Sequence, residues 1–188
     1  LNRPQSHLRD HMPYYIEGEP ESDYLKIAKP VDIRLLDPAC GSGHMLTYAF
    51  DLLYAIYEEE GYAPADIAAH ILRHNLHGLD ICPRAAQLAG MALTFKAREK
   101  SRRWLVQSTV QPNVMALRDV SFTDDELKEY MRELGLGALF SLPMLELLQQ
   151  FNQATTFGSL IQPCLDERTI AYALAEMERK YLGNNLFL

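Results

Sequence analysis

The sequence has 188 residues, of which 48% are hydrophobic, and it carries a formal net charge of -7. This length suits one α/β domain with a sizeable core and is too short for two ordinary domains. The acidic balance argues against a large phosphate-binding surface, because affinity for nucleic acids depends on Lys and Arg. Three widely spaced cysteines without a C-x-x-C pair predict reduced thiols, with neither a disulfide framework nor a zinc site.

The chain shows no sign of a membrane segment. No hydrophobic run approaches the ~20 residues of a transmembrane helix, and the first residues lack the design of a signal peptide. We therefore expect a cytoplasmic protein that does not contact a membrane. The basic cluster from Lys96 to Arg103 is best interpreted as the solvated end of a helix, with a contact to DNA as the less favoured alternative.

The sequence divides into three predicted segments. Residues 1–30 are rich in proline and charge and predict an irregular lead-in, in which Tyr14–Ile16 is the strand-like patch. Residues 31–120 are expected to form the core domain, and residues 121–188 a helical insertion or tail.

Short β-rich runs alternate with helical patterns in the core segment. The predicted elements, in chain order, are a strand (Val31–Leu36), a helix from Gly43 that stops at Gly61, a helix (Ala63–His74), a strand (Asn75–Ile81), a helix beginning at Pro83 and a strand (Trp104–Val110). This rhythm predicts a Rossmann-like, doubly wound parallel sheet. No strong strand follows, so the sheet is expected to be incomplete and followed by extra helices over Asp124–Leu134, Pro143–Ala154 and Glu167–Leu182.

A glycine-rich turn between the first strand and its helix is the strongest functional signal. Gly41 and Gly43 allow a sharp turn and close approach of a ligand, and the free N–H groups at the start of the helix favour an anionic or carboxylate-bearing ligand. Asp37, at the end of the strand, suits a cationic group. Asp80, at the end of the second strand, is placed to bind ribose hydroxyls, and Ile81 offers an apolar surface for a purine.

The residues of the glycine-rich turn and of the second strand end fit S-adenosylmethionine better than a nicotinamide dinucleotide. A dinucleotide fingerprint requires glycine or alanine where this chain has Leu46, and an acidic residue ~20 positions further on, whereas Asp80 lies much later. Both departures weaken the alternative of a nucleotide-binding oxidoreductase. A cofactor with a ribose, a purine and an ammonium-carboxylate tail, without pyrophosphate, fits better, and S-adenosylmethionine has these groups. The spacing of His70, His74 and His77 could suit a metal, but without an acidic partner we interpret these residues as a helix-end cluster and expect no metal.

The motif Asp37-Pro38-Ala39-Cys40-Gly41-Ser42-Gly43, followed by His44-Met45-Leu46, resembles the cofactor motif of gamma-class DNA adenine-N6 methyltransferases. The stretch from Leu76 to Ala89 resembles their second motif. Nearly the whole chain is similar to the PglX-type enzymes of BREX phage-defence systems and to methylase subunits of type II restriction-modification systems.

The resemblance implies a role for each matching residue. Asp37 would contact the methionine amino group, the backbone of Ala39 to Gly43 would line the methionine carboxylate, Asp80 would bind the ribose and Ile81 would pack on the adenine. Asn113 falls roughly where many relatives have an aspartate that binds the adenine amine.

The catalytic motif of that family, [ND]-P-P-[YFW], is missing, because none of the ten prolines is adjacent to another. The chain therefore contains no predicted catalytic residue and resembles a truncated cofactor half that is inactive alone. DNA would be bound through regions outside it, together with possible phage-defence partners. A non-catalytic protein-interaction domain, with the helical tail as its surface, is the alternative.

Overall fold

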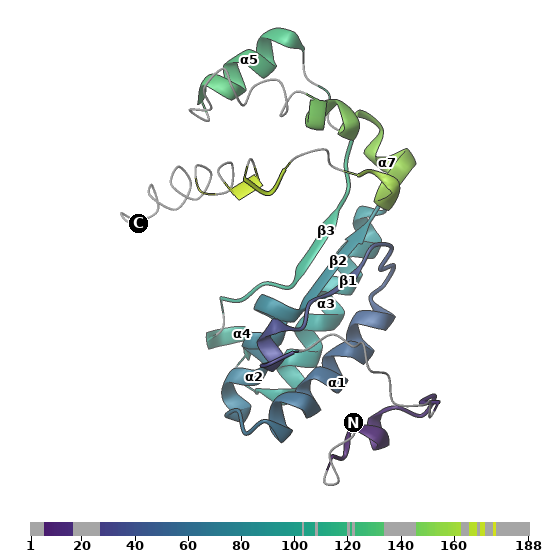
Figure 1. The fold of residues 1–188 in the computed structure, drawn as a ribbon, viewed down its shortest axis with the longest axis vertical. Helices are drawn as coiled ribbons and strands as arrows, with labels where there is room; N and C mark the ends of the chain where they lie inside the picture. Colours follow the sequence, from purple (N-terminus) through teal and green to yellow (C-terminus); the bar gives the residue numbers. More distant parts are fainter. Residues whose placement is uncertain are drawn as a thin grey trace. The chain divides into compact units, whose positions relative to one another are not determined.

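The computed structural model divides the chain into two compact units, residues 1–117 and 118–188 (Figure 1). The described residues are 6–16, 27–102, 104–107, 109–119, 121, 123–133, 146–162, 166–168, 170, 171 and 175. Residues 1–30, predicted as a separate lead-in, are part of the first unit.

The first unit is built on a three-stranded parallel sheet in the order β1-β2-β3. The strands are β1 (Leu35–Asp37), β2 (Leu76–Asp80) and β3 (Asn113–Ala116). Asp37 pairs with Gly78, and Asp80 pairs with Ala116. Because the strands are parallel, Asp37 and Asp80 both end their strands at the same edge of the sheet. The fold is thus a small parallel α/β sheet, consistent with an incomplete Rossmann-like methyltransferase fold.

The main helices pack on one face of this sheet. They are α1 (His44–Glu59), α2 (Pro64–His70), continued by a π-helical turn (Ile71–Asn75), and α3 (Pro83–Lys100). α1 and α3 contact each other and both contact β2, and α2 contacts both helices, so that the three lie together beside the sheet (Figure 1). The core between helices and sheet consists mainly of aliphatic and aromatic side chains; its largest fully buried members are Leu46, Phe50, Tyr57, Ile67, Ile71, Leu72, Leu76 and Leu93.

Two predicted strands were wrong in whole or in part. Residues 30–32 form a short 3-10 helix, and only the end of the predicted run from Val31 to Leu36 lies in β1, which extends to Asp37. Trp104–Val110 is not a strand: Trp104–Gln107 form the short helix α4, and the third strand starts only at Asn113. Trp104 is buried in the core while Val106 is almost fully exposed. Packing of the indole therefore overrides the β-propensity of this run.

A buried polar group fixes the beginning of the sheet. The side chain of Asn75, at the end of the π-helical turn, is fully buried. Its amide nitrogen donates to the carbonyls of Pro30 and Ile33 at 2.8 and 2.7 Å, and its amide oxygen accepts the Tyr57 hydroxyl at 2.9 Å. Asn75 thereby joins α1, the start of β2 and the chain that enters β1. A buried amide with all these bonds is stabilising, whereas one left unpaired is costly.

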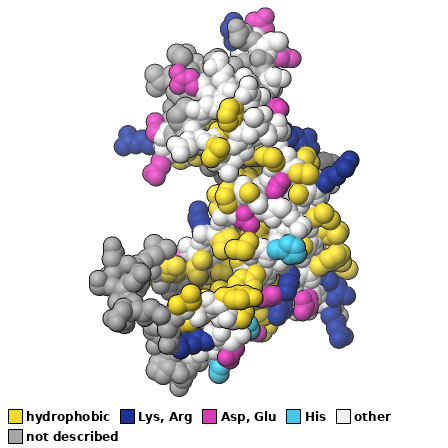
Figure 2. Space-filling view, turned by 90° about the vertical axis from the view of Figure 1, so that its right-hand side faces the viewer, with side chains coloured by type: hydrophobic (Ala, Val, Ile, Leu, Met, Phe, Trp, Pro, Cys, Tyr) yellow, Lys and Arg dark blue, Asp and Glu magenta, His cyan; other side chains and the backbone are white. Residues whose placement is uncertain are grey.

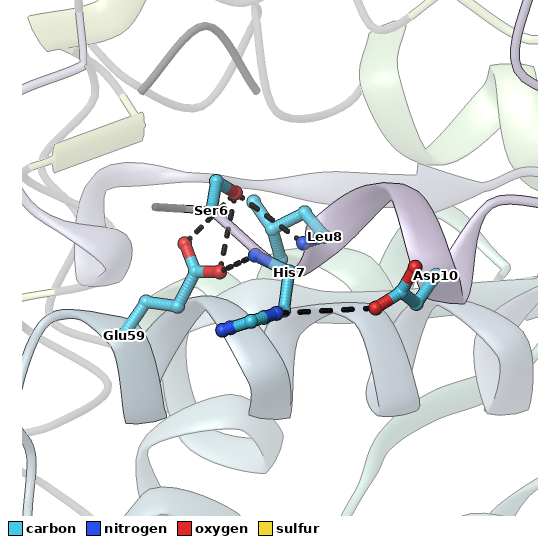
Figure 3. Close-up of polar contacts among 5 residues, drawn as sticks. All are labelled: Ser6, His7, Leu8, Asp10 and Glu59. Carbon is cyan, nitrogen blue, oxygen red and sulfur yellow. Dashed lines mark hydrogen bonds and ion pairs between the residues drawn. The ribbon is translucent and has the colours of Figure 1, made fainter. Parts of the chain in front are cut away.

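The lead-in is fastened along α1, as Figure 3 shows. The Ser6 hydroxyl and the His7 backbone N–H both donate to the carboxylate of Glu59, the latter at 2.6 Å. Further along, the Tyr48 hydroxyl donates to the His11 carbonyl at 2.8 Å. The patch Tyr14–Ile16 forms no strand and is exposed. The first described part of the lead-in thus contains a 3-10 turn (Leu8–His11), and side chains of α1 hold it.

The regular elements described in the second unit are all helical. Its elements are α5 (Asp124–Glu133), a helical turn over 146–150, 3-10 turns (Phe151–Gln153 and Gly158–Leu160) and α7 (Ala154–Phe157). Thr155 donates its backbone N–H and its hydroxyl to the carboxylate of Asp119 at 2.8 and 2.9 Å. The first predicted tail helix is confirmed over 124–133, and the second over 146–150 and at 154. Most of the third, Glu167–Leu182, lies outside the described residues.

Candidate functional site

The glycine-rich loop follows β1 at the carboxyl edge of the sheet and leads into α1. Gly41 and Gly43 have φ angles of +53° and +86°, a region that other L-residues adopt only with strain. Gly43 is the N-cap residue of α1, and its carbonyl accepts the N–H of Thr47 at 2.8 Å. The two positive φ values explain why glycines occupy these positions.

Asp80 joins the second strand to this loop. One carboxylate oxygen accepts the Gly41 N–H at 2.8 Å, and the other accepts the Cys82 N–H at 2.7 Å. Its backbone carbonyl accepts the N–H of Leu117, just after β3. The structure therefore brings Asp80 to the loop, as the sequence predicted from strand order. Its role as the group that fastens the loop had no signal in the sequence, because these contacts connect residues far apart in the chain.

Most backbone N–H groups of the loop are already used within the protein. Ala39 donates to the Asp37 carboxylate at 3.2 Å, Cys40 to the Leu79 carbonyl at 2.9 Å and Gly43 to the Cys40 carbonyl at 2.8 Å. The Gly41 N–H is held by Asp80, so within residues 39–43 the Ser42 N–H alone has no acceptor among the described residues. Within residues 39–43, few backbone donors therefore remain for a ligand. The donors open to a ligand are Ser42 and the first turn of α1, whose N–H groups have no helical acceptors.

Close packing beneath the loop sets its position. A methyl group added at Gly43 would lie 2.9 Å from Cβ of Ala89 in α3. One added at Gly78 in β2 would lie 2.9 Å from Cδ1 of Leu46 and 3.2 Å from Sγ of Cys40. The bulk of Leu46, which departs from the dinucleotide pattern, is thus accommodated by a glycine on the strand. On the other side, a methyl group at Gly41 would meet nothing within 4 Å, so the loop is open there.

The local charge favours a cationic or neutral group beside the loop. Burial raises the pKa of the Cys40 thiol, and the nearby carboxylates of Asp80 and Asp37 raise it further. Burial and the raised pKa both favour the protonated thiol, so Cys40 is best described as a packing group under the loop. Ile81, directly after β2, exposes about half of its side chain (51%) next to these acidic groups.

No model of a known protein family matches the sequence. Two curated relatives, however, are similar over most of it. The adenine-specific methyltransferase BrxX of Escherichia coli O9:H4 (strain HS) is 36% identical over 207 residues, which cover 95% of this chain. The adenine-specific methyltransferase PglX of Lacticaseibacillus casei (strain Zhang) is 36% identical over 150 residues, or 78% of this chain. The chain belongs to the PglX-type methyltransferase family. It spans only 17% and 12% of the lengths of these two relatives.

One predicted site residue of this PglX-type chain lies away from the others. Asn113 begins β3, where it pairs with His77, three residues before Asp80 on β2. At ~3.3 Å per residue, this places it roughly 10 Å from the carboxyl edge. Its side-chain nitrogen donates to the carbonyl of Leu72 at 3.0 Å. Asn113 therefore holds the strand to the π-helical turn, and the structure does not bring it to the glycine loop.

The other sequence expectations for the PglX-type chain concern membranes and metals. Among the described residues, no helix is long and apolar enough to cross a membrane.

The histidines at the end of α2 and in the π-helical turn stack on aromatic rings. His70 stacks on Tyr57 with ring centroids 5.9 Å apart, and His74 stacks on His70 at 6.1 Å. Burial lowers the pKa of His74, and the neighbouring His70 lowers it further. These histidines belong to an aromatic cluster at the end of α2, and the described residues contain no group of three metal-binding side chains.

Proposed function

We propose that this chain is the cofactor-binding part of an adenine-specific DNA methyltransferase, and that its glycine loop binds S-adenosylmethionine. Both relatives carry the name adenine-specific methyltransferase. The observation that carries the proposal is the bond between the Asp80 carboxylate and the Gly41 N–H, which places an acidic side chain directly beside an open glycine loop.

The residues at the loop fit the groups of this cofactor. Each oxygen of Asp80 accepts one N–H, which leaves lone pairs for ribose hydroxyls. Asp37 suits the ammonium group of the methionine end, and Ser42 offers its N–H to the carboxylate. Ile81 supplies an apolar surface for the adenine. When bound there, the cofactor would supply a methyl group that is readily transferred.

The loop would discriminate against a pyrophosphate cofactor. Asp37 and Asp80 flank the loop. Within residues 39–43, every backbone donor except the Ser42 N–H already has an acceptor among the described residues. An anionic pyrophosphate would find few free N–H groups and two negative charges close by. This argument supports S-adenosylmethionine over a nicotinamide dinucleotide.

For the whole enzyme we propose DNA as the substrate, S-adenosylmethionine as the methyl donor and phage defence or restriction-modification as the role. DNA would be bound mainly by residues outside this chain. On the face drawn in Figure 2, the described Lys and Arg side chains are scattered among acidic and hydrophobic ones and form no continuous basic surface. Because the chain has no adjacent prolines, we expect no methylation of DNA by the chain alone, in an assay that follows incorporation of labelled methyl groups.

Calorimetric titration of the chain with S-adenosylmethionine, S-adenosylhomocysteine and NAD tests the proposal. We expect saturable binding of the first two, weakened at least about tenfold by Asp80→Ala, because a hydrogen-bonding charged group contributes about 1.5–3 kcal/mol. Since Asp80 also fastens the loop, Ile81→Glu is the second variant; it alters an exposed side chain beside the loop and should weaken binding as well.

Asp66→Ala is the matched control, because Asp66 is an exposed carboxylate in the first turn of α2. It should leave the affinity unchanged. Binding of NAD alone, absence of binding by the folded chain, or binding that neither Asp80→Ala nor Ile81→Glu weakens would refute the proposal. Absence of binding would favour the protein-interaction alternative.

A further inference from the structure

α3 carries an apolar stripe on the side that faces away from the core. Its buried residues Ala86, Ala89, Leu93 and Ala97 follow helical spacing toward the sheet. Leu88, Met91 and Phe95 are spaced i, i+3, i+7 on the opposite side and are 51%, 50% and 56% exposed. An outer helix is expected to present polar residues to solvent. This stripe, defined as Leu88, Met91 and Phe95, is therefore unexplained by the fold of the first unit.

The stripe has a basic residue on its own face at each end. Arg84 precedes Leu88 by four residues and Arg98 follows Phe95 by three, so both lie close to the line of the stripe. Neither has an ionic partner among the residues that the structure describes. Glu99 lies beside Arg98, but Lys100 and Arg102 follow it, so that the C-terminal end remains net positive. In a chain with a net charge of -7, this local excess of cations stands out.

Two other basic residues of this region, Lys96 and Lys100, have structural partners. Lys96 forms an ion pair with Asp51 of α1, and the Lys100 ammonium lies 4.5 Å from the centroid of the Tyr54 ring. These two cations join α3 to α1. Within the described part of the chain, Arg84 and Arg98 have no such partner, and they flank the stripe instead.

From this arrangement we propose that the outer face of α3 docks an amphipathic helix whose apolar residues are flanked by acidic ones. Three apolar side chains over two turns are the size of anchor set that helix-in-groove recognition uses. Acidic residues near the two ends of the incoming helix would face Arg84 and Arg98. The inference goes beyond the proposed cofactor site, because α3 contacts the loop through Ala89 on its inner side and the stripe lies on its outer side.

Charge argues against a second copy as the occupant. Arg84 and Arg98 lie at equal distances along the helix on either side of Met91. If two stripes paired antiparallel about Met91, Arg84 of one copy would lie opposite Arg98 of the other, and like charges would face each other at both ends. An acidic helix would instead place carboxylates opposite both arginines, so that opposite charges face each other. The apolar side chains between the arginines also distinguish the face from a phosphate-binding surface.

The probe for this surface is a designed helical peptide with leucines at i, i+3 and i+7 and glutamates beyond each end of that set. A matched peptide has lysines in place of the glutamates. Titrated into the chain with fluorescence anisotropy as the readout, the acidic peptide should bind with a Kd on the order of 10–100 µM. The lysine peptide should bind at least about threefold more weakly, as expected for exposed charge pairs.

Phe95→Ser should weaken the acidic peptide about tenfold, because Phe95 supplies the largest apolar side chain of the stripe. Arg84→Glu combined with Arg98→Glu should reverse the preference between the two peptides. Val106→Ser, which changes an exposed apolar residue of α4 outside the stripe, is the control and should have no effect. All variants alter exposed or half-buried positions, and unchanged melting temperatures would verify that they fold.

Equal affinity for both peptides, or binding that Phe95→Ser leaves intact, would overturn the proposal. So would displacement of the acidic peptide by duplex DNA at low salt, which would assign the arginines to phosphate binding. Dimerisation that Phe95→Ser abolishes, measured by sedimentation equilibrium, would overturn it in favour of a second copy.

Discussion

Gly43 and Gly41 form a matched pair with which the packing of the loop can be tested. Both have positive φ angles, so replacement by alanine strains the backbone in each case, at a cost of about 1–2 kcal/mol. Only at Gly43 does the added methyl group collide, 2.9 Å from Cβ and 3.0 Å from Cα of Ala89. Overpacking of this kind costs about 1–3 kcal/mol more. Gly43→Ala should therefore lower the free energy of unfolding by about 2–5 kcal/mol, and Gly41→Ala by about 1–2 kcal/mol.

Urea unfolding followed by Trp104 fluorescence measures this difference. Trp104 is the single tryptophan of the chain and is buried in the core of the first unit, so its emission reports on that unit. With a slope of about 1–3 kcal/mol per molar urea, the Gly43→Ala midpoint should fall roughly 1 M below that of Gly41→Ala. Equal midpoints would refute the argument that α3 packs directly against the loop. Gly41→Ala should still weaken S-adenosylmethionine binding, because its methyl group enters the open side of the loop.

Two further predictions concern titrating groups. Burial raises the pKa of the Tyr57 hydroxyl to about 12, although the hydrogen bond to Asn75 acts in the opposite direction. The contribution of the protonated Tyr57 to the free energy of unfolding is therefore fully present below about pH 10 and is lost as pH rises toward 12. Tyr57→Phe should have a lower melting temperature at neutral pH. Between about pH 9 and 11 its melting temperature should fall less than that of the wild type, and an equal fall would contradict the prediction. Partial desolvation raises the pKa of Glu59, but the hydrogen bonds from the lead-in, the His7 N–H foremost, lower it below its ordinary value of 4.5. The hydrogen bonds that hold the lead-in to Glu59 are thus complete above pH 4.5 and are lost as pH falls through the lowered pKa. Hydrogen exchange of the His7 amide, corrected for its intrinsic pH dependence, should therefore accelerate in that lower pH range. Glu59→Gln should accelerate it at neutral pH, Glu58→Gln should not, and equal effects of the two variants would show that the carboxylate does not hold the lead-in.

The long helices α1 and α3 and the strand β2 could be predicted from local patterns, and β1 only in part. α1 repeats apolar residues at helical spacing between two glycines, and α3 begins at a proline, so that both are encoded by neighbouring residues. β2 was predicted nearly to its bounds for the same reason. Trp104–Val110 was predicted wrongly because its β-rich composition is a weaker determinant than burial of the indole. Spacing along the chain was the only basis for expecting Asn113 near the cofactor. Its observed position, at the amino end of β3, is set by the register of the sheet, which spacing along the chain does not reveal.

The sequence by itself determined the family, the glycine loop and the acidic residues that end β1 and β2, because motif residues and strand ends are local features. Only the tertiary structure decided how the loop is held. Its Gly41 N–H is bound by Asp80, Gly43 rests against Ala89, and Leu46 fits over Gly78. Each of these contacts joins residues from different elements, and their distances depend on how helices and strands pack. That packing also left the Ser42 N–H as the one donor of residues 39–43 without an acceptor among the described residues, and it turned the stripe of α3 toward solvent. Neither outcome can be predicted from the order of residues.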